Sequence, residues 1–459
     1  MQIDYFLFFA LLEKEMIGKK LEEVARHLGV DLMSEKLVNG FAVDSRKIIP
    51  GSMFFALKGE KVDGHDFLEE ARDKGAICAV VNKAGISKIE GLDLIYVEDV
   101  LLSLQELARL KMLEQKTRCI GITGSVGKTT TKEFLATLLE GSFNVEKTPG
   151  NENSQTGVPL SILHTEGDPE FFIAEMGMSQ KGEIASLVSI IPPEIAIVTQ
   201  VSLAHALYFP KGLEEVAEAK AEILSHPLTK KGFIHTQVSP FTAFCKRQNP
   251  LMVFYGKEED GVDIGVLASG NGYKIRTESG LTREFTLPFT AKHLVDNFLG
   301  AALVAKELGV SWEEIFIRAE KLKPYRMRFE RIEKEGVVYI NDSYNANPAS
   351  MKAALENIPR PGFGGKVIAA LGHMGELGHF SKQAHKEVGE IASLYADVLF
   401  CIGEDTQYMA ESFIKSGKRA LQFSCFQEFK DALKKQIDQK DVVLIKASNS
   451  LKLWRVLDE

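Results

Sequence analysis

The stretch Cys119–Glu133 reads CIGITGSVGKTTTKE, and the rest of the chain is organised around it. Its apolar start, Cys119–Thr123, predicts a buried strand, and the apolar spacing within Glu133–Leu139 predicts a helix. Two glycines, Lys128 and a run of threonines stand between the two elements. Glycines before a helix N-terminus let backbone N–H groups approach an anion, because no Cβ stands in the way. The stretch therefore predicts a phosphate-binding loop.

The side chains of this loop suit a nucleotide. Lys128 can reach terminal phosphates as a point charge, and Thr129 or Thr130 can offer a hydroxyl to Mg²⁺. The loop departs from GxxxxGK[ST], because Ile122 stands where the first glycine belongs. The alternative is a glycine-rich turn with an exposed lysine, but the coincidence of strand, glycines, lysine and helix favours nucleotide binding. The candidate ligands are Gly124, Ser125, Val126, Gly127, Lys128, Thr129 and Thr130.

Length and composition limit the class of protein. A chain of 459 residues is expected to form about two to four domains. With 45% hydrophobic and 26% charged residues it has the composition of a globular protein. The formal net charge of -8 argues against nucleic acid as the main partner, although a local pocket can still take a small anionic substrate.

Cysteines and apolar runs bear on the compartment. None of the five cysteines forms a CxxC pair, so they are expected to be reduced core residues of a cytoplasmic protein: Cys78, Cys119, Cys245, Cys401 and Cys425. The apolar run Tyr5–Leu12 is too short to span a bilayer and lacks the flanks of a signal peptide. We expect it to pack into a core, and we expect no membrane helix.

The order of strands and helices predicts an α/β protein of three domains. Residues 1–105 form a small domain with strands at Phe41–Val43 and Met53–Leu57 and a helix at Asp66–Lys74. Its polar loop Asp44-Ser45-Arg46 is either an anion contact or turn chemistry. Its second polar loop, Asp63–Asp66, is more simply explained as a helix N-cap.

Residues 106–324 alternate strands and helices, which predicts a parallel sheet covered on both faces, with a more antiparallel flap over Ile264–Leu287. The predicted elements are the strands Cys119–Thr123, Phe171–Met176, Ile195–Val201, Phe233–His235 and Met252–Tyr255, and the helices Glu133–Leu139, Gly182–Ser189, Leu213–Leu224 and Leu294–Leu308.

Residues 325–459 repeat this alternation as a second, Rossmann-like α/β unit, with strands at Val337–Ile340, Lys366–Leu371, Val398–Ile402, Ala420–Phe423 and Val442–Ile445. Many strands of both units end in polar or glycine clusters, such as Glu175-Met176-Gly177, Leu371-Gly372-His373, Gly403-Glu404 and Lys446-Ala447-Ser448. Parallel sheets bind ligands at the carboxyl ends of their strands. We therefore expect the two domains to face a shared cleft.

Three further groups are candidates for chemistry. Glu175 follows an apolar strand and is either a Mg²⁺ ligand or a surface turn acid. Lys220 lies between alanines in AEAKAEI, where a buried amine with a lowered pKa can react with CO₂ and become an anionic carbamate ligand. The run Asn341–Pro348 is dense in polar side chains and is either a capped turn or a ligand contact, with Asp342, Tyr344 and Asn345 within it.

These motifs together resemble the ATP-dependent Mur ligases of peptidoglycan synthesis. The resemblance runs over nearly the whole chain and rests on these segments: VDSRKIIPGSMFFALKGEKVDGHDF, TGSVGKTTTKE, NENSQTGVPL, EMGMSQKGEI, LAH with AEAKAEI, DSYNANPASMKAAL, and LGHMGELG with His385. It implies three domains: 1–105 for a UDP-sugar peptide, 106–324 for ATP, and 325–459 closing over the active site. It also implies a cytoplasmic enzyme of cell-wall growth and cell division, expected to be a monomer.

The resemblance implies a role for each site residue. Ser45, Arg46, Gly64 and His65 would contact the UDP-sugar. Thr129, Glu175, His205 and a carbamylated Lys220 would hold Mg²⁺, and Lys128, Glu175, His205 and Lys220 form the catalytic set. The residues that would reach nucleotide or substrate are Asn151, Asn297, Arg328, Asp342, Tyr344 and Asn345.

The implied reaction is amide ligation. ATP would phosphorylate the terminal carboxylate of UDP-N-acetylmuramoyl-tripeptide, and the amine of D-alanyl-D-alanine would attack the resulting acyl phosphate. Little covalent work falls to the protein in this reaction, because positioning and charge neutralisation account for most of the catalysis.

The chain departs from the family pattern at Gln200, Pro210, Leu294 and His373, and the final KGSR is Lys446-Ala447-Ser448-Asn449. Three alternatives stay open. The first is a ligase that adds glutamate to folates, which would usually lack the VDSR and DGHDF segments. The second is a catalytically weak homologue that binds UDP-sugar peptide as a module. The third is a P-loop ATPase coupled to motion.

Overall fold

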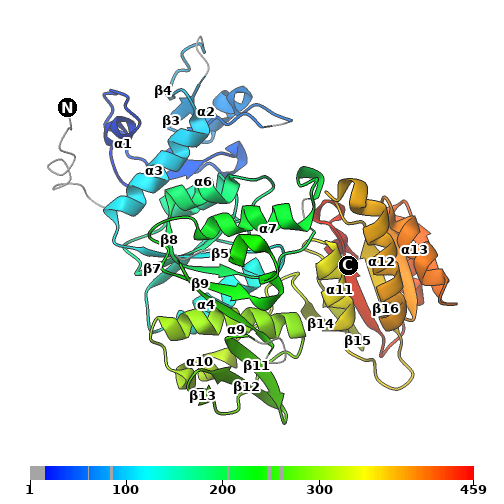
Figure 1. Ribbon diagram of the computed structural model, residues 1–459. Coiled ribbons are helices and arrows are strands. Elements are labelled where there is room, and N and C mark those ends of the chain that lie inside the picture. Colours follow the sequence, from blue (N-terminus) through cyan, green and yellow to red (C-terminus); the bar gives the residue numbers. More distant parts are fainter. Residues whose placement is uncertain are drawn as a thin grey trace.

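The computed structural model describes residues 16–59, 61–82, 86–203, 206–245, 250–257 and 262–458, which fold around three β-sheets (Figure 1). The apolar run Tyr5–Leu12 and His205 lie outside the described residues, so the predictions for them are not addressed. The three-domain α/β architecture is confirmed, with one sheet in each domain. The domain boundaries at 105 and 324 stay predictions.

The N-terminal sheet has four parallel strands in the order β1-β2-β3-β4. Its elements are α1 (Leu21–His27), β1 (Gly40–Ala42), η1 (Ser45–Lys47), β2 (Ser52–Phe55), η2 (Gly64–Phe67), α2 (Leu68–Asp73), β3 (Cys78–Val81) and β4 (Asp93–Tyr96). The predicted helix Asp66–Lys74 was wrong at its start. The Asp63 side chain accepts from the His65 N–H, so a 3₁₀ turn begins at Gly64 and α2 follows it.

The helix α3 (Val100–Glu114) connects the N-terminal sheet to the central domain. Its buried residues Leu104 and Leu107 share one apolar cluster with Phe55 of β2 and with Ile162 of α5 (Gly157–Leu163). The two domains therefore share a continuous core along this helix.

The central sheet has the strand order β13-β12-β11-β10-β9-β8-β5-β7-β6. Strands β5 to β11 pair in parallel, and β12 and β13 form the predicted antiparallel flap. The strands are β5 (Arg118–Thr123), β6 (Val145–Lys147), β7 (Phe171–Glu175), β8 (Pro193–Val198), β9 (Lys231–His235), β10 (Leu251–Lys257), β11 (Ile264–Ser269), β12 (Gly272–Thr277) and β13 (Gly280–Leu281).

Helices cover both faces of this sheet, as predicted. They are α4 (Lys128–Leu139), α5, α6 (Glu183–Ile190), α7 (Leu213–Ala221), α8 (Thr242–Cys245), α9 (Lys292–Glu307) and α10 (Trp312–Ala319). Figure 1 shows α6 and α7 on one side of the sheet and α9 and α10 on the other. Successive strand residues point to opposite faces: Ile173 of β7 packs in the cluster with α4 and α9, and Phe172 packs in the cluster with α5 and α6.

Some central elements were misplaced or missed. The predicted helix Glu133–Leu139 begins earlier, at Lys128, because the threonine run has low helix propensity yet forms the first turn of α4. Four further elements were not predicted from the sequence: β6, α5, α8 and α10. The first two are short and carry little periodicity, whereas the Ser311–Glu314 capping box was a readable start signal for α10.

The C-terminal sheet has the order β14-β15-β19-β16-β17-β18, and all its pairs are parallel except β14 with β15. Its elements are β14 (Glu330–Lys334), β15 (Val337–Asn341), α11 (Pro348–Glu356), β16 (Val367–Gly372), α12 (Ser381–Tyr395), β17 (Val398–Ile402), α13 (Thr406–Ile414), β18 (Arg419–Phe423), α14 (Phe426–Gln436) and β19 (Val442–Lys446). The charged, largely exposed strand β14 was missed, because it lacks the apolar character of the others.

Two hydrogen bonds join the C-terminal domain to the central domain away from the phosphate loop. The Leu207 N–H donates to the carbonyl of Glu376 at 2.9 Å, and the Lys292 N–H donates to Asn357 Oδ1 at 2.9 Å. These contacts place the two sheets beside each other, as Figure 1 shows.

The cysteine prediction held only in part. Cys78, Cys119 and Cys401 are buried and free, whereas Cys425 is exposed, so the expectation that it is a core residue was wrong. The side chain of Cys245 lies outside the described part. Among the residues that the structure describes, no helix combines the length and apolar character needed to cross a membrane.

Phe134 is a test of the core that seats α4. Its ring is 1% exposed and stacks on Phe289 with ring centroids 5.2 Å apart. Phe134→Ala should lower the free energy of unfolding by about 3–5 kcal/mol, because it leaves a cavity under α4. The measurement is urea unfolding followed by circular dichroism. Leu102→Ala, at a site 61% exposed, is the control and should change stability by less than about 0.5 kcal/mol. Equal losses in the two variants would contradict the packing argument.

Candidate functional site

Two glycines carry the chain from β5 into α4. Gly124 has φ +150° and Gly127 has φ +87°. A Cβ on Gly124 would lie 1.8 Å from Thr199 Oγ1, and a Cβ on Gly127 would lie 2.3 Å from Asn297 Oδ1. Both positions therefore require glycine. The first N–H groups of α4 have no acceptor within the helix, so the loop presents donors to whatever anion lies in front of it.

The loop is held from behind by the residues after β8. The Ser125 N–H donates to the carbonyl of Gln200 at 2.7 Å, and the Ser125 hydroxyl donates to the carbonyl of Ser202 at 3.0 Å. The Thr199 hydroxyl donates to the carbonyl of Val126 at 2.6 Å. The departure at Gln200 thus leaves the loop support intact, because the contact uses its backbone.

Lys128 lies at the start of α4 and points along the loop. Its Nζ donates to the carbonyl of Gly124 at 2.8 Å. Burial lowers the pKa of Lys128, and the negative charge of Glu175 acts against that shift. Lys128 is part of the lining of the site. Among the described residues, its Nζ donates a hydrogen bond only to the backbone carbonyl of Gly124.

Glu175 ends β7 and is 1% exposed. Its Oε1 accepts from Thr129 Oγ1 at 3.1 Å and from Asn153 Nδ2 at 2.7 Å, and its Oε2 lies 3.2 Å from Lys132 Nζ. Burial acts to raise the pKa of Glu175, but Lys132, Lys128 and the Asn153 hydrogen bond outweigh it and hold that pKa below the usual value. Glu175 is therefore a buried carboxylate, and the alternative of a surface turn acid was wrong.

Lys132, like Asn153, belongs to this network and was not predicted from the sequence. Its side chain is fully buried, and its Nζ donates to the carbonyl of Gly150 at 2.5 Å as well as pairing with Glu175. It connects α4, the end of β7 and the loop that carries Asn151 and Asn153. A readable signal existed, because Lys132 lies one helical turn after Lys128.

The oxygen atoms around Glu175 fit a hard cation. The Thr129 hydroxyl and the Glu175 carboxylate are ligand types that Mg²⁺ prefers, and Glu175 Oε2 accepts no hydrogen bond within the described part. Among the described residues, no group of three or more His, Cys, Asp or Glu side chains is placed so that it could hold a metal ion by itself. A cation at Glu175 would therefore share its shell with oxygens of a bound phosphate or of water.

Lys220 is buried on α7, as its alanine neighbours predicted, and is 2% exposed. Burial lowers the pKa of Lys220 well below its usual value, and the charge of Lys128 lowers it further. No hydrogen bond or ion pair reaches its Nζ from the residues that the structure describes. Burial therefore favours the neutral form of this amine, which is its nucleophilic form.

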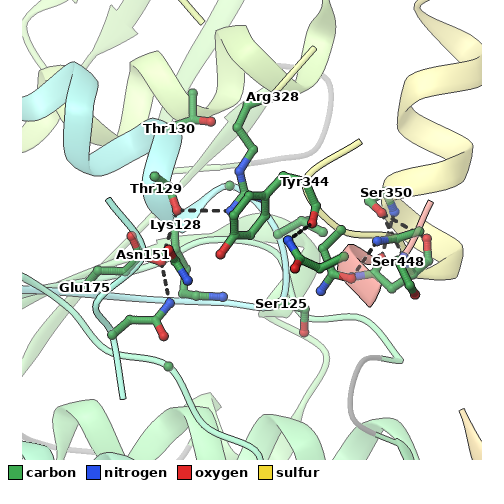
Figure 2. A pocket seen from close by; sticks show the side chains of 18 of the residues that line it. Ser125, Lys128, Thr129, Thr130, Asn151, Glu175, Arg328, Tyr344, Ser350 and Ser448 are labelled. Atoms are coloured by element: carbon green, nitrogen blue, oxygen red, sulfur yellow. Dashed lines mark hydrogen bonds between the residues drawn. The ribbon is translucent and has the colours of Figure 1, made fainter. Parts of the chain in front are cut away.

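The opposite wall comes from the C-terminal domain. Arg328 Nη2 donates to Thr129 Oγ1 at 3.3 Å, and its guanidinium carbon lies 3.7 Å from the centroid of the Tyr344 ring. Figure 2 shows Arg328 lying across Tyr344 and reaching toward Thr129 of the phosphate loop. One arginine from beyond the central domain thus stands above the phosphate loop.

Between these walls lies a cleft of about 590 Å³ (Figure 2). The predicted site residues that line it are Ser125, Val126, Gly127, Lys128, Thr129, Thr130, Asn151, Glu175, Asn297, Arg328, Asp342, Tyr344 and Asn345. Lining residues that the sequence analysis did not single out include Asn153, Gln155, Glu183, Ser350 and Ser450. The predicted shared cleft at the strand ends is confirmed, although the clusters Leu371-Gly372-His373 and Gly403-Glu404 are not part of its lining.

The predicted UDP-sugar contacts lie elsewhere, in the N-terminal domain, and none of them lines this cleft. The Ser45 hydroxyl donates to Glu70 Oε1 at 3.1 Å, and Arg46, with a side chain 80% exposed, pairs with Asp44. His65 is buried, with Nδ1 2.6 Å from Asp63 Oδ1 and Nε2 accepting from the Asn82 N–H at 3.3 Å.

Gly64 donates its N–H to the carbonyl of Leu57, and a Cβ on it would lie 2.6 Å from that oxygen. Structural contacts therefore occupy Gly64 and both ring nitrogens of His65, while the Arg46 side chain remains accessible to solvent.

Two of the departures from the family pattern, Gln200 and Leu294, line the cleft. Pro210 lies outside the lining, shortly before α7 begins at Leu213. His373 is half-buried, with Nε2 3.4 Å from the Ser450 hydroxyl and Nδ1 unpartnered among the described residues. Burial lowers the pKa of His373, which favours the neutral form of its ring.

Comparisons with known proteins agree with this geometry. The family models that match are the Mur ligase family catalytic domain at residues 37–112, the Mur ligase middle domain at 122–305 and the Mur ligase glutamate ligase domain at 327–449. A UDP-N-acetylmuramoyl-tripeptide–D-alanyl-D-alanine ligase of Bacillus subtilis is 33% identical over 453 residues, covering 97% of this chain and 98% of that protein.

Two solved structures share the fold. The MurF ligase from Thermotoga maritima in complex with ADP has a TM-score of 0.76 at 29% identity, covering 92% of this chain and 96% of that one. MurF from Acinetobacter baumannii has a TM-score of 0.83 at 25% identity, covering 96% and 98%.

The Lys132–Glu175 pair can be tested by removing the cation. Lys132→Met should lower the free energy of unfolding by about 3–5 kcal/mol, because it leaves a buried carboxylate without its nearest cation. Urea unfolding followed by circular dichroism measures the loss. The matched control is Lys147→Met, since Lys147 pairs with Glu133 of the same helix but is partly exposed, and its loss should stay below about 1 kcal/mol. If Lys132→Met lowers the free energy of unfolding no more than the control does, the conclusion that Lys132 stabilises the buried Glu175 charge is contradicted.

Proposed function

The chain belongs to the Mur ligase family, and from this membership we propose that it adds D-alanyl-D-alanine to UDP-N-acetylmuramoyl-tripeptide at the expense of ATP. It is an ATP-dependent amide ligase, and its product is the UDP-pentapeptide precursor of peptidoglycan. The observation that supports the proposal most is the cleft in which the phosphate loop of one domain faces the strand ends of the next. Relatives that carry this activity in their names align with nearly the whole chain.

We propose that the nucleotide lies in this cleft. Its phosphates would meet the N–H groups of the loop from Gly124 to Thr130 and the ammonium of Lys128. Asn297 and Asn151 line the same cleft, and the family resemblance implies that Asn297 contacts the adenine. The nucleotide contacts from the C-terminal domain would be Arg328, Asp342, Tyr344 and Asn345.

We assign Mg²⁺ to the carboxylate end of this cleft. Thr129, Glu175, His205 and a carbamylated Lys220 would hold it, directly or through water. When bound, Mg²⁺ neutralises charge on the transferred phosphoryl group. The carbamate on Lys220 would add an anion near Lys128, where the structure now places two amines whose charges oppose each other.

The three domains would divide the work. Residues 1–105 would bind the UDP-sugar, with Ser45, Arg46, Gly64 and His65 at the contact. Residues 106–324 would bind ATP, and residues 325–459 would close over both. Closure would keep water away from the acyl phosphate, which water otherwise hydrolyses. The enzyme would work as a cytoplasmic monomer.

The chemistry has two balanced steps. The terminal carboxylate of the tripeptide attacks the γ-phosphorus of ATP and ADP leaves, which gives an acyl phosphate. The amine of D-alanyl-D-alanine then attacks the acyl carbon, forms the amide, loses a proton and releases inorganic phosphate. Lys128, Arg328 and the N-terminus of α4 contribute by positioning the phosphates and by stabilising negative charge on the group in transfer.

The decisive experiment measures phosphate release with Mg-ATP, UDP-N-acetylmuramoyl-tripeptide and D-alanyl-D-alanine, with each substrate omitted in turn. Phosphate release should require all three, and mass spectrometry should identify a UDP-pentapeptide. Lys128→Ala should lose turnover, because the phosphates lose their nearest side-chain cation. Absence of phosphate release with UDP-tripeptide still bound would overturn the proposal and favour a binding module. Substrate-independent ATP turnover would favour an ATPase.

Lys220 has a test of its own. Lys220→Ala should lower kcat by at least about 100-fold, and added short carboxylates should restore part of it, because they replace the missing carbamate anion. Lys181→Ala is the control. Lys181 pairs at the surface with Glu218 of α7, the helix that carries Lys220, and its removal should leave kcat unchanged. Unchanged activity of Lys220→Ala, or a loss that no carboxylate relieves, would contradict the carbamate role.

A further inference from the structure

The cleft contains a buried cation that the proposed chemistry does not use. Lys446 ends β19 and is 2% exposed. Its Nζ lies 2.6 Å from Asp342 Oδ2 and donates also to the carbonyls of Asp342, at 3.2 Å, and Asn345, at 2.9 Å. Among the described residues, all three hydrogen-bond partners of this ammonium therefore belong to one short loop after β15.

The same loop is held at a second point by a neighbour of Lys446. Asn449 Nδ2 donates to the carbonyl of Tyr344 at 2.9 Å. Asn449 stands where the family pattern has arginine. The carbonyls of Asp342, Tyr344 and Asn345 are thus each bound by a side chain from the end of β19.

Asp342 also contacts the segment that carries Arg328. Its Oδ1 accepts from the Phe329 N–H at 3.0 Å, while its Oδ2 is bound by Lys446. Met327 and Phe329, the residues on either side of Arg328, both have φ 58°, a conformation that side-chain-bearing residues adopt rarely. Local preference alone does not select this shape, so contacts such as the one from Asp342 stabilise it.

We propose that Lys446 is a positioning residue that acts through Asp342 and its loop to place Arg328 and Tyr344 over the phosphate loop, with Asn449 as its partner. Arg328 depends on this support because its Nε has no hydrogen-bond partner among the described residues, and its guanidinium group contacts the Tyr344 ring and Thr129. The inference rests on the proposed function only in taking the cleft as the nucleotide site.

Binding of ADP measured by calorimetry in the absence of D-alanyl-D-alanine tests this directly. Lys446→Met should weaken ADP binding by about tenfold, because the arginine that meets the phosphates is no longer held. Arg328→Ala should weaken binding to a similar degree. The double variant should bind no more weakly than the weaker single variant, since both changes remove the same interaction. In turnover assays, KM for ATP should rise while KM for D-alanyl-D-alanine stays near that of the unmodified protein.

Lys418→Met is the matched control. Lys418 lies in the same domain and also donates to two carbonyls, those of Ser393 and Ala396, but it is not part of the cleft lining. It should leave ADP binding unchanged. If Lys446→Met fails to fold, Asn449→Ala, at an exposed position, should still weaken ADP binding by about threefold.

Normal ADP binding by both Lys446→Met and Asn449→Ala would overturn the inference. A double variant of Lys446→Met and Arg328→Ala whose loss of ADP affinity equals the product of the two single losses would also overturn it. Normal binding by Arg328→Ala would also overturn it, because Lys446 is proposed to act through that side chain. Each of these results leaves ligation by the unmodified protein intact, so they are distinct from a failure of the proposed function.

Discussion

A buried carboxylate is the constraint on which the site depends. Glu175 lies at the end of β7 with almost no exposed surface, and a charge in that position is stable only when it is paired and hydrogen-bonded. Thr129 and Lys132 of α4 and Asn153 of the loop before α5 meet this need. The phosphate-loop helix, the end of β7 and the loop of Asn153 are therefore held in one arrangement by the requirement to stabilise one charge.

The second constraint operates between domains. Arg328 comes from the segment that leads into the C-terminal sheet, yet it donates to Thr129 of the phosphate loop. Its position is set from the end of β19, through Asp342, and its planar group lies on the Tyr344 ring. Apolar residues of both domains also share one cluster, with Phe134 and Leu294 from the central domain and Met351 from the C-terminal domain.

The sequence allowed much of this architecture to be predicted, and the failures have physical causes. The apolar strands β5, β7 and β17 were found close to their observed bounds, because fully buried parallel strands are almost continuously hydrophobic. The strand β14 was missed because it is charged and largely exposed and therefore has no hydrophobic run. The start of α4 was placed too late, because a threonine run resembles a strand until a tertiary site makes it the first turn of a helix.

The sequence by itself determined the phosphate loop, the three α/β domains and the identity of most residues in the cleft, because glycine spacing, hydrophobic runs and polar strand ends are local properties of a chain. Only the tertiary structure decided that Lys132 supports Glu175, that Lys446 and Asn449 hold the loop of Tyr344, and that Arg328 reaches the phosphate loop. These contacts join residues far apart in sequence or hidden on one helix face. Which polar group meets which buried charge depends on distances that appear only when the sheets are packed together.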